Sequence, residues 1–352
     1  MTNRKALVVG ATGVTGAPLC EQLLRQGWDV YAISRRVPLL SATVSSGRLT
    51  HLPIDLSDAR AIQDGLVAHS DITHVFYCAN APTQELRKAM ISQLLDGLER
   101  APNFENINFI QGMKYYGCHL GPFRTPAKET DPRIPNCDFY YTEEDMLLAR
   151  QTGRPWSWTV LRPHSVCGYT AGNPLNVAVV LALYGSIQKE RGEVFGFPGT
   201  EASFNSLFQV VDANLLARAS IHVSTTASCE NKAFNINNGD IFRWSNLWPA
   251  LADAFDLPCA GPQGYSPTRF FEHETTTWQA MVKQHGLKMF PYEQLPRWCL
   301  GEYKEPNGRL SAEHDIIANT TRLRKSGFTE VVDSQDMFLN IFAELRAQNV
   351  IP

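Results

Sequence analysis

The sequence of 352 residues lacks a dominant charge, a long hydrophobic run and any pattern of paired cysteines. Its 32 Lys and Arg residues nearly balance 35 Asp and Glu residues, so the formal net charge is −3. That balance produces no strong field toward nucleic acid or anionic membranes. The longest apolar stretch, Val177–Tyr184, is far shorter than the roughly 20 residues that a helix needs to cross a bilayer. We therefore expect neither nucleic acid nor a membrane as a partner.

Cysteine and histidine are present but are not spaced as ligands. The eight cysteines are scattered without a CxxC pair, which argues against a disulfide or zinc framework and favours a reducing compartment. The nine histidines show no HExxH or other ligand spacing, so we expect no metal. The first residues contain no apolar run followed by a cleavage site of small residues, so we expect a cytoplasmic protein.

What the sequence does contain is an alternation of short apolar runs and helical patterns in its first half. Hydrophobic residues make up 44% and charged residues only 19%, which excludes a disordered chain and allows a sizeable core. Continuous apolar strands that alternate with helices are typical of a parallel sheet covered on both faces. Strands are expected at 6–10, 29–34, 49–54, 74–80, 107–113 and 158–162, and helices at 14–26, 59–68 and 84–99.

In the second half of the sequence, strands and helices no longer alternate regularly. Val177–Ile187 predicts an apolar helix, and Lys232–Ile236 predicts one more strand of the main sheet. We therefore expect an α/β fold in which residues 1–170 form a Rossmann-type, doubly wound parallel sheet. Residues 171–352 are expected to form a smaller, mainly helical substrate-binding region, with a segment near 205–240 returning to the sheet.

A glycine-rich loop, GATGVTG at residues 10–16, directly follows the first expected strand and opens the first expected helix. Glycines at these positions permit a tight turn and a close approach of backbone to a pyrophosphate, and the helix N-terminus supplies amide donors. An ordinary glycine turn is the weaker interpretation, because the strand–helix context is the one that a dinucleotide requires. The residues expected to contact the cofactor here are Gly10, Thr12, Gly13, Val14, Thr15 and Gly16.

The end of the second expected strand indicates which dinucleotide binds. An acidic residue there would bind the ribose of NAD, whereas this chain has Ser34, Arg35 and Arg36. Two guanidiniums and a hydroxyl suit a 2′-phosphate, so we predict NADP(H) as the cofactor. After the third expected strand, Asp55 and Leu56 are placed to border the adenine; capping of the next helix is an alternative role for the aspartate.

The usual catalytic pair of a short-chain reductase, a Tyr with Lys four residues later, is missing. None of the 11 tyrosines has this spacing; Tyr140, for example, is followed by Glu144. Either the chain is inactive or the lysine comes from elsewhere. Lys114 follows an apolar strand whose carboxyl end would face a nicotinamide, and from there it could reach a tyrosine that opens the next helix. A solvated loop lysine and packed aromatic rings are the plain alternatives.

Several motifs in order resemble one known family. The glycine loop is similar to the TGxxGxxG motif of extended short-chain dehydrogenases/reductases, with Val9 in place of Thr. Residues 114–123 (KYYGCHLGPF) resemble the KxYxGPF-type motif of the progesterone 5β-reductase/iridoid synthase family, lengthened between Tyr116 and Gly121. Residues 138–145 (DFYYTEED) resemble its NFYYxxED motif, with Asp138 replacing Asn. Segments 233–240, 242–244 and 247–249 are similar to the family as well.

The resemblance implies roles for individual residues. It places the catalytic lysine at Lys114 and the catalytic tyrosine at Tyr140, and it assigns Phe123 and Tyr116 to the substrate pocket. The stretch RPHSVCG at 162–168 is similar to the RPxxxxG region of extended reductases, which implies that Pro163, Ser165 and Val166 border the nicotinamide. Similar proteins are often dimers, so a homodimer is a possible partner state, and the sequence leaves the oligomeric state open.

The implied activity is NADPH-dependent reduction of the carbon–carbon double bond of enones or enals, with a small apolar carbonyl compound as substrate. Some members of the family follow reduction with cyclisation. Three alternatives stay open from the sequence. The chain could guide an isomerisation or cyclisation with little net reduction, it could reduce the carbonyl carbon itself, or it could be a non-catalytic NADP(H) sensor.

Overall fold

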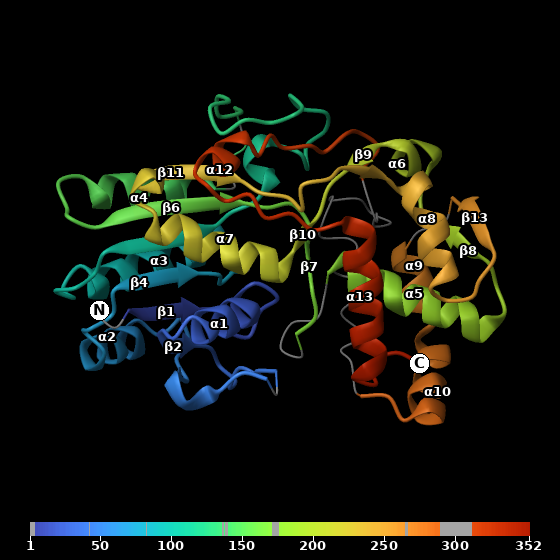
Figure 1. Cartoon of the computed structure of the whole chain (residues 1–352), viewed down its shortest axis with the longest axis horizontal. Helices are drawn as coiled ribbons and strands as arrows, with labels where there is room; N and C mark the ends of the chain where they lie inside the picture. Colours follow the sequence, from blue (N-terminus) through green and yellow to red (C-terminus); the bar gives the residue numbers. More distant parts are fainter. Residues whose placement is uncertain are drawn as a thin grey trace.

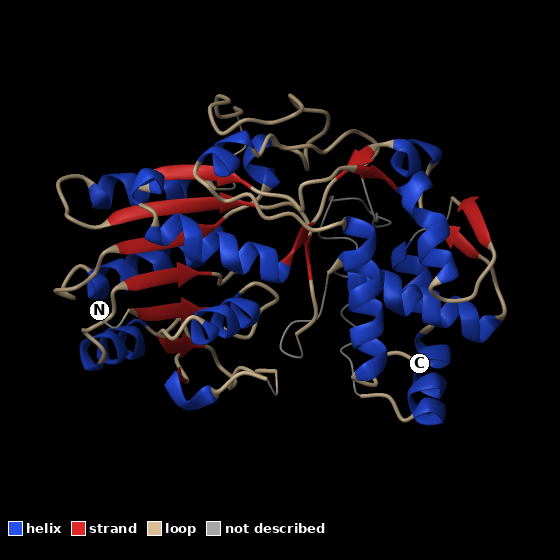
Figure 2. Ribbon diagram, viewed as in Figure 1, coloured by secondary structure: helices blue, strands red, loops and turns tan. Residues whose placement is uncertain are grey.

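The molecule is built on a seven-stranded parallel sheet with helices on both faces (Figures 1 and 2). The computed structural model describes residues 4–352 except 42, 82, 136, 138, 139, 171–175, 265, 266 and 289–311. The strand order is β11-β6-β5-β4-β1-β2-β3, and every pairing in this sheet is parallel. The strands are β1 (Lys5–Val9), β2 (Asp29–Ile33), β3 (Leu49–Leu52), β4 (His74–Tyr77), β5 (Asn106–Ile110), β6 (Ser157–Arg162) and β11 (Lys232–Asn235).

Strand β1 shows why both faces need covering. Ala6 and Val8 point into one apolar cluster, Leu7 and Val9 into another, and all four are fully buried. Helices α1 (Gly16–Arg25) and α7 (Ala213–Thr225) pack together on the first face, and α2 (Ala59–Ala68) packs with α3 (Gln84–Leu98) on the second. Helix α4 (Tyr141–Gln151) packs beside α3. The expected doubly wound parallel sheet is confirmed.

Strand order reverses between β1 and β4, which makes this the switch point where such sheets bind dinucleotides. The first five strands end one to three residues earlier than the sequence pattern predicts, and β4 and β5 differ most. β4 ends at Tyr77 and β5 at Ile110, because the chain there leaves the ladder to form the loops above the sheet edge. After β5 the loop is a short 3₁₀ turn, η2 (Met113–Tyr116). The carboxyl ends of the strands, drawn as arrowheads, all face the helical second half of the chain (Figure 2).

Two segments from the second half of the sequence build the sheet domain. β11 pairs in parallel with β6, and α7 packs over β5 and β6. The short strands β7 (Val166–Cys167) and β10 (Val211–Asp212) pair where the chain crosses to the helical region and returns from it. Helix α7 was not expected from the sequence; it begins after Asp212, whose carboxylate accepts a hydrogen bond from the Leu215 amide at 2.8 Å.

The helical region is organised around α5 (Val177–Arg191), which is buried on every side from Val177 to Gln188. Helix α13 (Ser334–Ala347) packs along it, and a cluster of aromatic rings fills the space toward α8 (Trp244–Asp253). No helix in the described parts of the chain is both long and apolar enough to span a bilayer. The remaining elements are η1 (Ser46–Arg48), β8 (Phe195–Phe197), α6 (Glu201–Asn205), β9 (Leu207–Phe208), η3 (Ala227–Cys229), β12 (Phe242–Arg243), β13 (Cys259–Pro262), α9 (Pro267–His273), α10 (Thr275–His285) and α12 (Thr321–Lys325).

Candidate active site

The glycine loop has a geometry that only glycines permit. Gly10 has a φ of +87°, and a Cβ there would lie 2.9 Å from the backbone nitrogen of Ala79. A Cβ on Gly16 would overlap the carbonyl of Gly10. Gly13 is open on its outer side, since the nearest atom to a Cβ would be the Gly10 carbonyl oxygen at 3.5 Å. The turn therefore fits a pyrophosphate laid against the N-terminus of α1.

The strand end beyond this loop carries exposed positive charge. Arg35 and Arg36 are exposed after β2, while Ser34 is buried and donates its hydroxyl to the Arg36 carbonyl at 2.6 Å. Exposed guanidiniums at this position fit a 2′-phosphate. Two hydrogen bonds from Ser57, together with the positive charge of Arg35, lower the pKa of Asp55.

The adenine side of the predicted site consists of Asp55 and Leu56. Asp55 accepts hydrogen bonds from the amide and hydroxyl of Ser57 at 2.9 and 2.8 Å, which closes a tight turn. The cap of helix α2 is Asp58, whose carboxylate accepts from the amides of Arg60 and Ala61. Of the two roles considered for Asp55, the helix cap thus belongs to its neighbour, and contact with adenine stays a prediction.

Two hydrogen bonds bring the segments of Lys114 and Tyr140 together. The Cys137 thiol donates to the Lys114 carbonyl at 3.3 Å, and the Tyr141 hydroxyl donates to the Tyr115 carbonyl at 2.7 Å. The residues that open α4 are therefore docked against η2, although a long loop separates the two elements in the chain. The turn that carries Lys114 thus meets the helix start that carries Tyr140, and a catalytic pairing of the two side chains stays a prediction.

The Tyr140 hydroxyl lies at the carboxyl ends of β5 and β6. Tyr140 is 9% exposed, and its Oη would be 3.3 Å from a Cβ on Gly112, the residue that precedes η2. The same Cβ would be 3.3 Å from the carbonyl oxygen of Pro163, which accepts a hydrogen bond from the Met113 amide at 3.1 Å. The absence of a side chain at Gly112 thus makes room for the phenol beside the predicted nicotinamide-bordering backbone.

The segment after β6 joins this point to the glycine loop. Ser165 has a φ of +44°, a left-handed conformation that is strained for a residue other than glycine. The Thr170 hydroxyl donates to the Thr12 carbonyl at 3.2 Å, and a Cβ on Gly168 would be 3.5 Å from the Val14 side chain. The predicted cofactor residues Pro163, Ser165 and Val166 lie along this connection.

Tyr116 takes part in a buried polar network. Its hydroxyl donates to Asn235 at 2.7 Å and accepts from the fully buried Arg162 at 3.1 Å, and burial raises its pKa to about 12. Arg162 also donates to Glu144 at 3.0 Å and lies 3.3 Å above the ring of Tyr115. This network ties β6, α4 and η2 together. A contact with substrate could be made only by the ring of Tyr116. Phe123 is half-buried and meets the His314 ring edge-on at 6.3 Å.

Two buried polar groups beside this site were missed by sequence reasoning. His164 is buried, its Nε2 makes no hydrogen bond among the described residues, and its ring meets Phe208 at 4.9 Å. Burial, followed by the charges of Lys114 and His314, lowers its pKa to about 3. Arg87 of α3 lies over the Tyr140 ring at 5.2 Å. The sequence gives no signal for Arg87, because its partners come from other elements; His164 has only its place beside Pro163.

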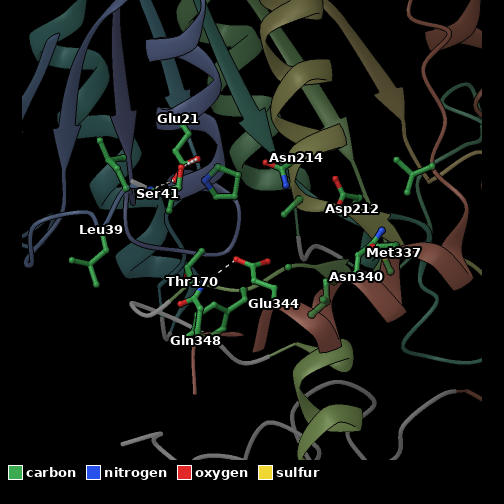
Figure 3. Close-up of a pocket in the computed structure, with 18 of the residues that line it drawn as sticks. Glu21, Leu39, Ser41, Thr170, Asp212, Asn214, Met337, Asn340, Glu344 and Gln348 are labelled. Carbon is green, nitrogen blue, oxygen red and sulfur yellow. Dashed lines mark hydrogen bonds between the residues drawn. The ribbon is translucent and has the colours of Figure 1, made fainter. Parts of the chain in front are cut away.

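A separate cavity of about 850 Å³ lies between α1, the N-terminus of α7 and α13 (Figure 3). Glu21, Asp212 and Glu344 line it, and burial, followed by repulsion from the other two carboxylates, raises the pKa of Glu344. None of the residues predicted for catalysis or cofactor binding lines this cavity, so it is distinct from the site at Tyr140. Within the described residues, no group of three or more His, Cys, Asp or Glu side chains is arranged to hold a metal ion.

Comparison with known proteins gives two family matches and a shared fold. A family model described as a PRISE-like Rossmann-fold domain matches residues 70–352, and one described as the NAD dependent epimerase/dehydratase family matches residues 6–95. A UDP-glucose 4-epimerase from Thermus thermophilus, solved in complex with NAD, has a TM-score of 0.65 at 16% identity and covers 96% of this chain and 99% of its own. At that identity the likeness concerns the fold.

Three curated relatives match over nearly the whole chain. The short chain dehydrogenase gsfE of Penicillium aethiopicum is 28% identical over 99% of both chains. The (S)-8-oxocitronellyl enol synthase of Antirrhinum majus is 27% identical and covers 99% of this chain and 92% of its own. The 3-oxo-Delta(4,5)-steroid 5-beta-reductase of Arabidopsis thaliana is also 27% identical, with 99% and 93% covered.

Proposed function

The chain belongs to the PRISE-like Rossmann-fold domain family, and we propose that it is an NADPH-dependent reductase of the activated carbon–carbon double bond of enones or enals. It is an oxidoreductase of the short-chain dehydrogenase/reductase superfamily and uses a nicotinamide dinucleotide. The observation that carries the finer proposal is the position of the Tyr140 hydroxyl. It lies beside Gly112 and the Pro163 carbonyl, at the carboxyl ends of β5 and β6, and the turn of Lys114 is hydrogen-bonded to Cys137, which precedes Tyr140 in the chain.

The proposed chemistry depends on where charge develops. The chemistry that NADPH would supply when bound is a hydride for the carbon β to the carbonyl. Negative charge then builds on the carbonyl oxygen of the substrate, and the Tyr140 hydroxyl donates a hydrogen bond to that oxygen. A single donor of this kind is worth about 2.7–4 kcal/mol of barrier in a site that excludes water. Tyr140 is 9% exposed, which supports a site of this kind around its hydroxyl.

Lys114 supports this role through its positive charge. An ammonium near the phenol stabilises the negative charge that the phenol shares with the enolate oxygen. The same charge contributes to the lowered pKa of His164, which follows β6, so the Lys114 side chain also acts at the carboxyl end of that strand. A neutral His164 adds no charge beside this site, which supports a small apolar carbonyl substrate.

A second candidate function is release of the enol itself, with or without later cyclisation. The relative from Antirrhinum majus is named as an enol synthase, whereas the one from Arabidopsis thaliana is named as a steroid reductase. The two candidate reactions share the hydride step and differ in where the enolate takes its proton: protonation of the α-carbon gives the saturated carbonyl, and protonation of the oxygen gives the enol. Product identification separates them, since an enol or cyclised product and a saturated carbonyl have different structures.

The test is NADPH oxidation with a panel of small cyclic and acyclic enones and enals. We expect turnover by the unmodified protein and a loss of roughly 10²–10³-fold in kcat for Tyr140→Phe. Lys114→Met should lower kcat by at least about 10-fold, because the substitution removes a positive charge that acts through the phenol of Tyr140. Lys128→Met removes an exposed lysine from the same stretch of chain and serves as the matched control. NADPH binding without turnover on any substrate would contradict the proposal and favour a sensor.

A further inference from the structure

A buried arginine lies under the ring of Tyr140. Arg87 comes from α3 and is 6% exposed, and its Cζ lies 5.2 Å from the centre of the Tyr140 ring. Its Nε forms an ion pair with Glu143 Oε1 at 2.5 Å, and Asn80 Oδ1 accepts a hydrogen bond from its Nη1 at 3.0 Å. Asn80 belongs to the loop after β4, at the switch point of the sheet, so Arg87 connects the cofactor side of the site with the tyrosine.

This ion pair is incompletely satisfied. Among the described residues, four buried atoms here make no hydrogen bond: Arg87 Nε and Nη2, Glu143 Oε2 and the Tyr77 hydroxyl. Burial raises the pKa of Glu143 to about 7 despite the neighbouring guanidinium. A buried pair of this kind contributes little to stability relative to apolar side chains of the same volume. Stability alone therefore does not account for a charge at this position.

We propose that Arg87 is a positioning residue for Tyr140, whose guanidinium both fixes the phenol ring and strengthens the phenol as a hydrogen-bond donor. A cation over an aromatic ring is attracted by its face and favours negative charge on the ring substituent. Glu143 and Asn80 hold the guanidinium in that place, and Glu143 moderates its charge. This inference rests on the proposed function, because it assigns Arg87 to the donor that stabilises the enolate.

The neighbouring tyrosine offers a matched comparison. Arg133 lies over the Tyr141 ring at 4.8 Å, much as Arg87 lies over Tyr140. The Tyr141 hydroxyl, however, donates to the Tyr115 carbonyl and accepts from the Ile134 amide, both within 2.9 Å. The Tyr141 hydroxyl is therefore occupied by hydrogen bonds within the protein. A cation over its ring should have no effect on the reaction.

The charged and titratable groups around Tyr140 come from several elements: Arg87 on α3, Glu143 on α4, Lys114 on η2, Tyr77 at the end of β4 and His164 after β6. His164 stays neutral above pH 5, because burial holds its pKa near 3. Burial raises the pKa of Tyr77 above its usual value, so this phenol stays protonated where Tyr140 is titrated. Glu143 is ionised above about pH 8 and then opposes the charge of Arg87.

The experiment follows the high-pH limb of kcat/KM for enone reduction by NADPH, where the Tyr140 phenol loses its proton. Glu143→Gln keeps the guanidinium but removes its counter-charge, so the limb should move to lower pH by about half a unit to one unit. The double variant Arg87→Met/Glu143→Gln removes both charges, so the limb should move to higher pH and kcat at pH 7 should fall roughly 3- to 30-fold. Arg133→Met is the matched control and should leave the limb in place.

Two further measurements keep the outcome interpretable. In a Tyr140→Phe background, removal of Arg87 and Glu143 should cause no additional loss of kcat/KM, because its effect passes through the missing phenol. Circular dichroism and urea unfolding establish that each variant is folded. Shifts of the limb in the same direction for both variants, or an additive loss in the Tyr140→Phe background, would overturn the role of Arg87. Absence of turnover by the unmodified protein would instead refute the proposed function.

Discussion

Gly112 decides how closely the Tyr140 phenol can approach the strand ends. A Cβ at this position would be 3.3 Å from both the Tyr140 hydroxyl and the Pro163 carbonyl oxygen. Such contacts are tighter than side chains normally accept, so one of the two neighbours has to move by a few tenths of an ångström. The backbone of Pro163 is held by the Met113 amide, which leaves the phenol as the group that yields.

Gly112→Ala should therefore lower kcat by roughly 10-fold, because a small misplacement of a catalytic donor weakens transition-state stabilisation. The affinity for NADPH should change little, since the glycine loop is untouched. Gly261→Ala is the control, because a Cβ at Gly261 would meet nothing within 4 Å. Steady-state kinetics with an enone, together with NADPH titration by fluorescence, gives both quantities. An unchanged kcat would contradict the placement of the Tyr140 hydroxyl.

His164 gives a prediction about stability and pH. Its pKa is lowered by burial to about 3 in the folded protein and is near 6.5 when the chain unfolds. Between these values the unfolded chain binds a proton that the folded protein does not, so stability is lost as pH falls below about 6.5. At pH 5 the cost is about 2 kcal/mol.

His164→Phe should remove this part of the acid sensitivity while keeping an aromatic contact with Phe208. Urea unfolding at pH 7.5 and pH 5 measures the free energy of unfolding for both proteins. The difference between the two pH values should be smaller by about 2 kcal/mol in the variant. Equal pH dependence in the two proteins would show that His164 is protonated in the folded state at pH 5.

The strands and helices of the first half follow from local patterns, whereas the pieces that complete the sheet do not. Periodicity and the glycine loop predict β1 to β6 and α1 to α3 closely, because each is a continuous apolar or amphipathic segment. Helix α7 has the same kind of apolar face. It lies among loops and short strands, however, where strands and helices do not alternate regularly in the sequence. Whether it joins the sheet or the helical region depends on packing against α1, which a local pattern does not contain.

The N-cap of α7 can be tested directly. Asp212→Ala removes the acceptor for the Leu215 amide and should lower the free energy of unfolding by about 1 kcal/mol. Asp212→Asn keeps a side-chain oxygen at the same place and should retain most of that stability. Equilibrium urea unfolding compares the two variants. If both lose the same amount, the charge of Asp212, and not the cap, stabilises this helix.

Across the entire chain, the site joins residues that are far apart in sequence. The place of Lys114 after an apolar strand makes it a candidate, the resemblance to a family singles out Tyr140 as its partner, and their roles stay predictions. The contacts of Arg87 and His164 could not be predicted, because they arise where α3, α4 and the strand after α4 meet. The sheet presents its carboxyl edge to the helical region, so cofactor binding on that edge should stabilise the folded molecule as one unit.

NADPH should therefore raise the free energy of unfolding by about 2.7 kcal/mol when its concentration is 100 times its dissociation constant. NADH at the same concentration should raise it less, because it lacks the 2′-phosphate whose negative charge the exposed guanidiniums of Arg35 and Arg36 attract. In the double variant Arg35→Ala/Arg36→Ala, NADPH and NADH should stabilise the protein by nearly the same amount. Thermal shift assays measure all four combinations. Equal stabilisation of the unmodified protein by NADH and NADPH would contradict the assignment of these arginines.

The most direct test of the central claim is the position of the transferred hydrogen. An enone turned over with NADPH deuterated at the transferring position of the nicotinamide would be analysed by mass spectrometry and NMR. Our account predicts a product with an intact carbonyl and one deuterium on the carbon β to it, formed far more slowly by Tyr140→Phe. Deuterium on the carbinol carbon of an alcohol would contradict it, because the hydride would then have reached the carbonyl carbon.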